Sequence, residues 1–369
     1  MARMTAPAAT ALGVDFRVLA TSEDESAAQV CADVALGRHD DLDALLAFSD
    51  GCDVVTFDHE HVPPAYLRQM AERGVLVRPG PDALVHAQDK VLMRQALTDA
   101  GLPCPQWAVL ETAADGIAFA DRVGWPIIVK TSRGGYDGKG VWRIEGPAEL
   151  TALLDEVELA DHAQWLAEEC VPFTRELAAQ VARSPHGQAV AYPVVQTTQI
   201  DGICAEVVAP APGLSDAVAG RAQEVALQVA QHLGVVGMLA VELFEVGGEV
   251  LINELAMRPH NSGHWSIDGA VTSQFENHLR AVLDLPLGDP SARAPYTVMV
   301  NVLGGDVPDL YDAYKHVLAH DPELKVHLYG KDVKPGRKVG HVTVCGDDPD
   351  ELLARARHAA DYFSGRINE

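Results

Sequence analysis

A glycine-rich segment at residues 130–140, Lys-Thr-Ser-Arg-Gly-Gly-Tyr-Asp-Gly-Lys-Gly, places the strongest constraint on the fold. Four glycines within seven residues cannot hold a packed strand or helix, but they let the backbone approach a ligand and offer amides to an anion. The apolar run 127–129 precedes the segment, and the alternating run 141–144 follows it. We therefore predict a loop between two strands that closes over a nucleotide. A flexible hairpin is the alternative on the glycines alone, and Tyr136 and Asp137 at the tip favour a ligand.

Lysines at both ends of this segment support the same interpretation. Lys130 closes the preceding strand and Lys139 lies within the loop, so both can offer positive charge to phosphate oxygens. The spacing matches neither the P-loop nor the Gly-x-Gly-x-x-Gly dinucleotide pattern. A different kind of phosphate site is therefore predicted.

Composition limits the partners of the chain. Its 369 residues suit two or three domains, and its net charge is -25 at pH 7. A surface this negative repels nucleic acid and anionic membranes, so neither is an expected partner. An anionic small substrate must then meet a local cluster of lysine and arginine.

The cysteine pattern and the lack of apolar runs indicate the compartment. The six cysteines are scattered without Cys-x-x-Cys spacing, which favours reduced thiols over a disulfide frame or a zinc site. No apolar run is long enough to span a bilayer, and the N-terminus lacks a signal-peptide core. We expect a soluble cytoplasmic protein.

The first quarter of the chain alternates strands with helices, which is typical of a parallel α/β sheet. Such a domain normally opens with a strand, whereas this chain opens with a helical pattern. Either the sheet lacks a strand or the sequence starts downstream of the true start, and we favour the second explanation. Strands are predicted at 16–20, 53–57 and 75–77, and helices at 2–12, 41–48 and 64–73.

The rest of the chain combines antiparallel strand candidates with amphipathic helices. Asp89 is a candidate cap for the first of these helices, and the linker 285–290 precedes the last part of the chain. Helices are predicted at 90–100, 115–123, 148–157, 216–233, 271–283 and 349–363. Strands are predicted at 164–169, 176–183, 189–197, 238–246, 250–257, 297–303, 326–329 and 339–344, with 207–212 extended.

Two glutamates interrupt apolar strands and form a candidate metal site. Glu242 and Glu254 lie on either side of the turn Gly247-Gly248. A three-residue connection would place them opposite each other on one face, and a two-residue turn would place them on opposite faces. Facing carboxylates need a counter-charge, and such oxygen ligands suit magnesium held together with phosphates. Solvated glutamates on an exposed strand face are the alternative.

Two further polar clusters are candidate anion sites. Arg258, His260 and Asn261 follow the second glutamate strand and could supply charge and directed hydrogen bonds, unless the histidines are merely structural. Residues 329–341 form a basic island in an acidic protein. Its Lys331, Lys334, Arg337 and Lys338 could clamp a phosphate monoester, although an exposed basic turn is about as plausible.

With these residues in view, the sequence resembles the ATP-grasp superfamily, and within it the 5-(carboxyamino)imidazole ribonucleotide synthases. The resemblance covers nearly the whole chain. Its most specific parts are the loop 134–140 and the stretch His-Asn-Ser-Gly-His-Trp at 260–265. The other carrying segments are 53–57, 88–90, 192–195, 252–255 and 336–341.

The resemblance implies an ATP-grasp fold between two smaller domains. It implies a Rossmann-like pre-ATP-grasp domain at 1–88, an ATP-grasp domain at 89–288 with a flap subdomain at about 104–175, and a C-terminal β-rich domain at 289–369, a rudimentary barrel/sandwich hybrid. The family's first strand and its Gly-Gly-Gly-Gln-Leu-Ala-Arg-Met loop have no counterpart before Met4. The N-terminal domain is therefore expected to lack its first strand.

The resemblance also assigns roles to individual residues. Arg258, His260 and Asn261 would bind bicarbonate and the carboxyphosphate made from it, with Asp137 as a further catalytic residue. Glu242 and Glu254 would hold magnesium, for which manganese could substitute. The ATP-binding set would comprise Lys90, Lys130, Gly135, Tyr136, Asp137, Gly138, Lys139, Gly140, Val141, Glu168, Glu169, Cys170, Val171, Glu176, Gln199, Asn253 and Glu254. The aminoimidazole ribonucleotide would meet Tyr136, Asp137, Lys139, Lys331, Arg337 and Lys338.

The implied reaction is carboxylation of 5-aminoimidazole ribonucleotide with ATP and bicarbonate, in purine biosynthesis by a cytoplasmic homodimer. A different ATP-grasp ligase is one alternative, and the loop 134–138 argues against it. A non-catalytic nucleotide-binding protein is the other, and the presence of the whole predicted ATP and metal set argues against that.

Overall fold

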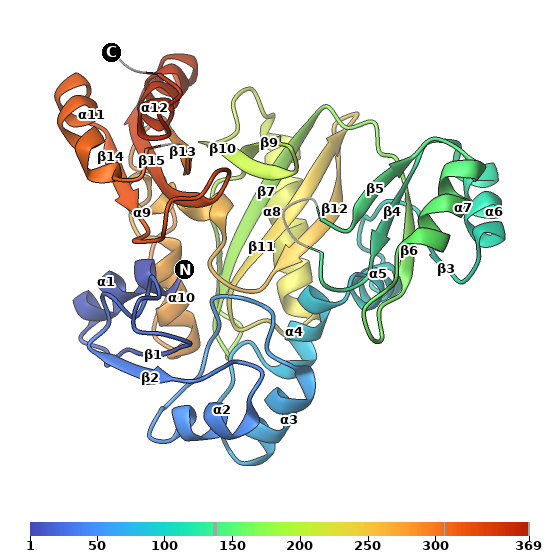
Figure 1. Ribbon diagram of the computed structural model, residues 1–369, viewed down its shortest axis with the longest axis horizontal. Coiled ribbons are helices and arrows are strands. Elements are labelled where there is room, and N and C mark those ends of the chain that lie inside the picture. The colour runs from blue at the N-terminus through green and yellow to red at the C-terminus, as the bar shows by residue number, and fades with distance from the viewer. Residues whose placement is uncertain (136–138, 306, 368–369) are drawn as a thin grey trace.

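The computed structural model describes residues 1–135, 139–305 and 307–367, and their strands form three separate sheets (Figure 1). A small N-terminal sheet lies at one side and a four-stranded sheet at the other, with a large central sheet between them (Figure 1). All six cysteines are free thiols, as the scattered spacing predicts. No helix of the described residues is both long and apolar enough to cross a membrane.

The N-terminal region begins with α1 (Ala2–Leu12), which ends at Gly13 in the left-handed conformation (φ 67°), as predicted. β1 (Arg17–Ala20) pairs in parallel with β2 (Asp33–Leu36), a strand that the sequence pattern did not indicate. The helices of this region are α2 (Leu42–Ser49), α3 (Pro64–Glu72) and α4 (Pro81–Gln88), and α4 was also not predicted.

The prediction of full strands at 53–57 and 75–77 is wrong. The two segments meet only at one parallel bridge, between Val55 and Val77. A cavity of about 930 Å³ is lined both by β1 and by residues 54–57, and β1 pairs only with β2 among the described strands. The predicted parallel pairing is therefore present in the β1–β2 pair and in the Val55–Val77 bridge, but these do not join into one continuous sheet.

The four-stranded antiparallel sheet holds the glycine-rich segment between its last two strands. Lys130 pairs with Val141 across that loop, as the strand–loop–strand prediction requires. One layer of helices packs on this sheet through Phe119, Leu150 and Trp165. The strands run in the order β3 (Trp107–Leu110), β6 (Trp165–Glu169), β4 (Ile127–Thr131), β5 (Val141–Ile144), and the helices are α6 (Ala113–Val123) and α7 (Pro147–Glu156). The preceding helix, α5 (Lys90–Asp99), buries Met93 and Leu97 in the core that it shares with the central sheet.

The central sheet contains nine of the described strands and runs through two of the expected domains. β10 pairs with β13, with Glu206 opposite Val300, so the C-terminal strands extend the same sheet. The predicted strand 189–197 is divided, because Pro193 cannot donate a ladder hydrogen bond. Its strands are β7 (Arg175–Arg183), β8 (Ala189–Ala191), β9 (Val195–Ile200), β10 (Ile203–Ala209), β11 (Gly237–Val246), β12 (Glu249–Ala256), β13 (Tyr296–Leu303), β14 (Lys325–Leu328) and β15 (Lys338–Gly346).

Helices cover this sheet and complete its core. α8 (Asp216–His232) buries Val225 and Val229 against β7, β11 and β12, and α12 (Pro349–Phe363) packs on β13 and β15. The helix predicted from residue 271 starts only at Gln274, since the Ser273 hydroxyl accepts a bond from Glu276 N and caps it. The remaining helices are α9 (Ser266–Gly269), α10 (Gln274–Val282) and α11 (Tyr314–His320), with 3-10 turns at Asn261–Gly263 and Leu310–Ala313.

Candidate active site

A cavity of about 1060 Å³ lies where the N-terminal region, the four-stranded sheet and the central sheet meet. Residues that the sequence analysis selected from separate motifs share its wall. They are Lys90, Lys130, Gly135, Val141, Glu168, Glu169, Cys170, Val171, Glu176, Gln199, Glu242, Asn253, Glu254, Arg258, His260, Asn261, Lys331 and Lys338.

A buried charge network holds Lys130 in place at one end of this cavity. Lys130 Nζ lies 2.6 Å from Glu168 Oε2 and donates to Asn253 Oδ1 at 3.2 Å. Arg94 on α5 donates to Glu168 Oε1 at 2.6 Å and to the Asn253 carbonyl at 2.7 Å. The network thus ties α5, β4, β6 and β12 together around one lysine.

Glu168 carries the negative charge of this network. Burial opposes its ionisation, but the charges and hydrogen bonds of Arg94 and Lys130 lower its pKa to about 2. The Glu168 carboxylate therefore stays ionised and is engaged by these two cations. Its side chain is not available for the adenine contact predicted at residues 168–171, so the backbone and the three following residues are the remaining candidates for that contact. Glu169, Cys170 and Val171 all line the cavity.

Sequence reasoning missed Arg94. Its side chain is fully buried, which is rare for arginine unless it is paired. The available signal was its place between Met93 and Leu97 in the predicted helix, where a charge has no solvated face to occupy.

Glu242 and Glu254 face each other, but by a different route from the one predicted. The turn between β11 and β12 is the two-residue Gly247-Gly248, because Val246 pairs with Glu249. Such a turn alone would place the glutamates on opposite faces. The register shifts between Glu242 and Leu243, leaving Asn253 as an extra residue, and this bulge brings Glu242 opposite Glu254.

The two carboxylates have different charge environments. Lys90 Nζ donates to Glu254 Oε1 at 2.5 Å, and its charge lowers the pKa of Glu254 although burial opposes this. Burial raises the pKa of Glu242, and the neighbouring charges of Glu254 and Glu176 raise it further. Glu242 would therefore take up a proton unless a cation lies beside it. With side chains 27% and 43% exposed, Glu242 and Glu254 fit a hard divalent cation such as Mg²⁺.

Next to these carboxylates, Arg258 and His260 provide different kinds of contact. Arg258 Nε donates to Glu60 Oε2 at 2.8 Å, which fixes its position. Burial, with the charges of Arg258 and Lys338, lowers the pKa of His260 to about 3, so this imidazole is neutral. His260 Nε2 lies 3.5 Å from Glu242 Oε1, and its Nδ1 lies 2.9 Å from Ser262 Oγ. His260 can thus direct a hydrogen bond, and Arg258 supplies the positive charge.

The other two polar residues of this stretch divide between a ligand-facing and a structural position. Asn261 lines the cavity, and its buried Nδ2 has no acceptor within the described part of the chain. His264 also borders the cavity, but its side chain is 2% exposed, its Nδ1 lies 3.0 Å from Gln274 Nε2, and its ring lies 5.0 Å from that of His341, centroid to centroid. For His264 the structural alternative is therefore the better interpretation.

The basic island also borders the cavity, where Lys331 and Lys338 lie on the wall. Ser26 Oγ donates to the Tyr329 carbonyl at 2.5 Å, and Gln29 Nε2 donates to the Gly330 carbonyl at 2.8 Å. The N-terminal region therefore braces this loop.

Arg337 and Lys334, from the same basic loop, do not line the cavity. Arg337 is exposed and donates to the Asp332 carbonyl at 3.2 Å. The predicted clamp of three cations thus has two of them on the wall in this conformation.

Models of three protein families match consecutive parts of the chain. The ribonucleotide synthetase preATP-grasp domain matches residues 1–88, the ATP-grasp domain 95–275, and the phosphoribosylaminoimidazole carboxylase C-terminal domain 297–355. N5-carboxyaminoimidazole ribonucleotide synthase of Mycobacterium tuberculosis is 54% identical over 368 residues, covering 99% of this chain and 86% of the relative. The chain belongs to the N5-carboxyaminoimidazole ribonucleotide synthase family.

Further members of the family support this placement. The Corynebacterium ammoniagenes synthase is 48% identical over 98% of this chain and 89% of its own length. The crystal structure of the Thermus thermophilus synthetase has a TM-score of 0.86 at 37% identity, covering 100% of this chain and 96% of that one. The Aspergillus clavatus synthase, in complex with ADP and 5-aminoimidazole ribonucleotide, has a TM-score of 0.88 at 30% identity, covering 99% and 96%.

The glycine loop most specific to the family is only partly described. Tyr136, Asp137 and Gly138 lie outside the described residues. At the loop's ends, Thr131 N donates to the Gly140 carbonyl at 3.0 Å, and Gly140 has a φ of 73°. A Cβ on Gly135 would lie 2.8 Å from the Lys139 carbonyl oxygen, so the close approach of the two sides of the loop requires glycine at position 135. Lys139 itself is exposed.

Proposed function

We propose that this chain carboxylates 5-aminoimidazole ribonucleotide with ATP and bicarbonate, giving 5-(carboxyamino)imidazole ribonucleotide for purine biosynthesis. One observation carries the proposal. A single cavity is lined by Lys90 and Lys130 beside the carboxylates of Glu168, Glu242 and Glu254, by Arg258, His260 and Asn261, and by Lys331 and Lys338. These three groups of residues suit a nucleoside triphosphate, a small anion and a phosphorylated acceptor in one site.

In this proposal, ATP binds beside Lys90 and Lys130. Both ammonium groups lie on the cavity wall, with Lys130 fixed by Glu168, so each can meet phosphate oxygens without first losing side-chain freedom. Residues 169–171 are the candidates for adenine and Glu176 for the ribose. Gln199, on the same wall, is a further candidate for nucleotide contact. The loop 135–141 would close over the phosphates.

Glu242 and Glu254, with Asn253 beside them, would hold Mg²⁺, for which Mn²⁺ could substitute. Oxygen donors, and a carboxylate pair in which burial and the neighbouring charge of Glu254 raise the pKa of Glu242, fit such an ion. When bound, the metal neutralises charge on the transferring phosphate. Lys90 could then donate either to Glu254, as it does in this structure, or to the phosphate oxygens.

Bicarbonate belongs beside Arg258, His260 and Asn261. A bicarbonate oxygen attacks the γ-phosphorus, the bond to the bridging oxygen breaks, and ADP leaves while carboxyphosphate forms. Carboxyphosphate then releases phosphate and carbon dioxide, and the exocyclic amine of the ribonucleotide attacks the carbon and loses a proton. Neutral His260 can orient the anion without forming a fixed ion pair with it. Exclusion of water by the closed loop, with Tyr136, Asp137 and Lys139 at the acceptor, would protect the intermediate.

The 5′-phosphate of the ribonucleotide belongs at Lys331 and Lys338. Arg337 would have to turn inward from its contact with the Asp332 carbonyl to join them. We further propose that the enzyme works in the cytoplasm as a homodimer.

The decisive experiment measures bicarbonate-dependent ADP release with and without 5-aminoimidazole ribonucleotide. Strong stimulation by the ribonucleotide, with formation of the carboxylated product, is the expected result. Bicarbonate-dependent ADP release that is indifferent to the ribonucleotide would favour a different ATP-grasp ligase. No ADP release, although Mg-ATP raises the melting temperature, would favour a non-catalytic nucleotide-binding protein.

A further inference from the structure

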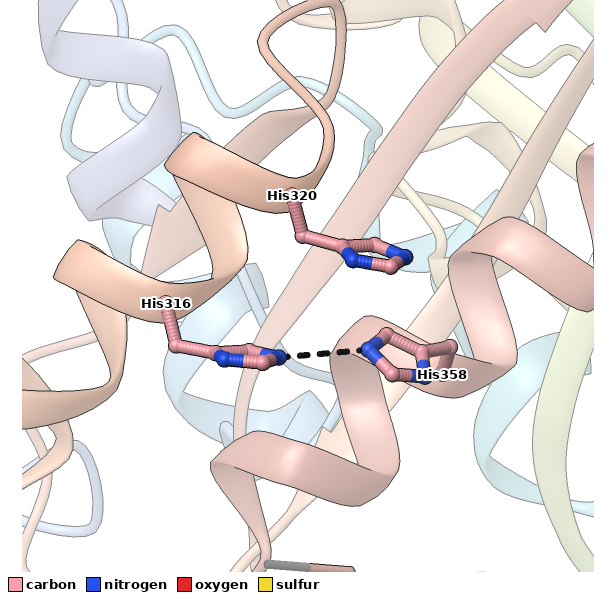
Figure 2. Close-up of side chains that lie close together, drawn as sticks. All are labelled: His316, His320 and His358. Carbon is pink, nitrogen blue, oxygen red and sulfur yellow. Dashed lines mark hydrogen bonds between the residues drawn. The ribbon is translucent and has the colours of Figure 1, made fainter. Parts of the chain in front are cut away.

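Three histidines gather on the C-terminal region, outside the active-site cavity. His316 and His320 lie one helical turn apart on α11, and His358 lies on α12, which packs beside it (Figures 1 and 2). One ring nitrogen of each lies within 4.8 Å of the others. Within the described residues, this is the one group of three or more histidine, cysteine or acidic side chains whose ligand atoms come so close together.

The distance between two of these rings matches a metal site. His316 Nε2 and His358 Nε2 are 3.3 Å apart and face each other edge to edge (Figure 2). Two imidazole nitrogens bound to one tetrahedral zinc ion at about 2.05 Å each are separated by about 3.3 Å. The two rings therefore already have the separation that a shared zinc ion requires.

The surrounding structure holds this pair in position. The His316 ring stacks on Tyr362 of α12, with centroids 3.9 Å apart and planes 8° from parallel. Arg355 of α12 bonds Asp321, which directly follows α11, at 2.8 and 2.9 Å. Since both contacts bind α11 to α12, the seam that carries the histidines is fixed independently of any ion.

His320 must turn to complete the site. Its ring stacks over His358 with centroids 4.4 Å apart, so its nitrogen lone pairs do not yet converge with those of the other two rings. His320 is exposed and is the last residue of α11, so rotation of its side chain meets little packing. Residues i and i+4 of a helix share a face, which keeps the rotated ring near His316.

We propose that His316, His320 and His358 bind a divalent transition metal ion of the zinc class, with water in the fourth position. Three neutral imidazoles suit zinc, nickel, copper or cobalt, whereas magnesium prefers oxygen donors. The site is thus chemically distinct from the Glu242–Glu254 pair, and it is independent of the proposed catalytic function. Bound metal links α11 to α12 and stabilises the C-terminal layer over β13 and β15.

The test is a zinc titration of the whole chain by isothermal titration calorimetry, with excess Mg²⁺ to occupy the carboxylates. The wild type should bind one zinc ion more than the His358→Asn and His320→Asn variants, or bind it at least about tenfold more tightly. His186→Asn is the matched control, because His186 is an exposed histidine on another part of the surface. It should retain the full zinc stoichiometry.

Two further readouts keep the result unambiguous. Cobalt substituted at the site should give visible absorption of a tetrahedral complex in the wild type and in His186→Asn, and lose it in His358→Asn. Zinc should raise the melting temperature of the wild type but not of His320→Asn, an exposed change that leaves the metal-free fold intact. Equal zinc binding by the wild type and both triad variants would overturn the proposal, and so would an equal loss in His186→Asn.

Discussion

The proposed ATP site and the proposed site for the ribonucleotide phosphate are built in opposite ways. At the first, Lys130 is held by a buried carboxylate, and that carboxylate is also paired with buried Arg94. At the second, Lys331 is exposed and belongs to a loop braced mainly through backbone carbonyls. Both sites are proposed to offer cations to phosphate, but of these two lysines only Lys130 is fixed by burial.

This difference separates stability from affinity. Removing one member of a buried charge network leaves its partners charged and desolvated, so the fold itself is affected. Removing an exposed lysine has a smaller effect on the fold, because water can solvate the groups that the lysine leaves behind. Substitutions at the first site should therefore change stability, and substitutions at the second should mainly change the affinity for the ligand.

The largest effect is expected for Glu168→Ala. Arg94 and Lys130 would lose their shared anion in a buried environment, so the free energy of unfolding should fall by about 3–5 kcal/mol. Chemical denaturation measures it, and Glu169→Gln, on the partly exposed neighbouring residue, is the control. A fall of less than about 1 kcal/mol would mean that the network is no more stabilising than a surface ion pair.

Glu254→Gln should leave the fold largely intact and impair the reaction. The change weakens the carboxylate pair and the contact with Lys90, so kcat for ribonucleotide-stimulated ADP release should fall about 100-fold or more. Glu249→Gln, at the exposed start of the same strand, should retain activity. Near-normal kcat in Glu254→Gln across a magnesium titration would argue against the proposed metal site.

The pH dependence of stability tests the buried network of Glu168 in another way. The pKa of Glu168 is about 2 in the folded chain against an ordinary value of 4.5, so its stabilising contribution is complete above pH 4.5 and is lost as the pH falls towards 2. The corresponding free energy is about 3 kcal/mol. In Glu168→Gln this part of the acid dependence should be absent. Parallel curves for the wild type and the variant between pH 4.5 and 2 would contradict the assignment.

The smallest effects on activity are expected for substitutions in the basic loop 329–341. Lys338→Ala and Lys331→Ala should each raise KM for the ribonucleotide about tenfold while leaving KM for ATP and the melting temperature nearly unchanged. Lys334→Ala lies in the same loop but off the cavity wall and is the matched control. Arg337→Ala sharpens the comparison, since an effect equal to that of Lys338→Ala would show that Arg337 turns inward when substrate binds.

Local features were predictable because short-range chemistry decides them. Asp89 caps α5 as expected, with Oδ1 accepting from Val91 N and Leu92 N. α12 spans the predicted residues, and the glycine loop connects β4 to β5. The resemblance to the synthase family also came from short segments, and the comparisons confirm it.

Long-range features could not be obtained in the same way. The pairing of Glu242 with Glu254 depends on a bulge at Asn253, which no turn rule indicates. Helices α4 and α11 were missed because each is short and buries few side chains, so its periodicity is weak.

The amino-acid sequence alone therefore established which residues carry charge, where helices are capped and which loop must be glycine, since each depends on neighbours within a few positions. Tertiary structure alone decided that Arg94, Glu168 and Lys130 form one network, and that Arg337 faces away from the cavity. The physical reason is burial. A charged side chain has a large effect on the free energy of folding only when segments distant in the sequence exclude water around it. The local sequence pattern does not indicate which segments those are.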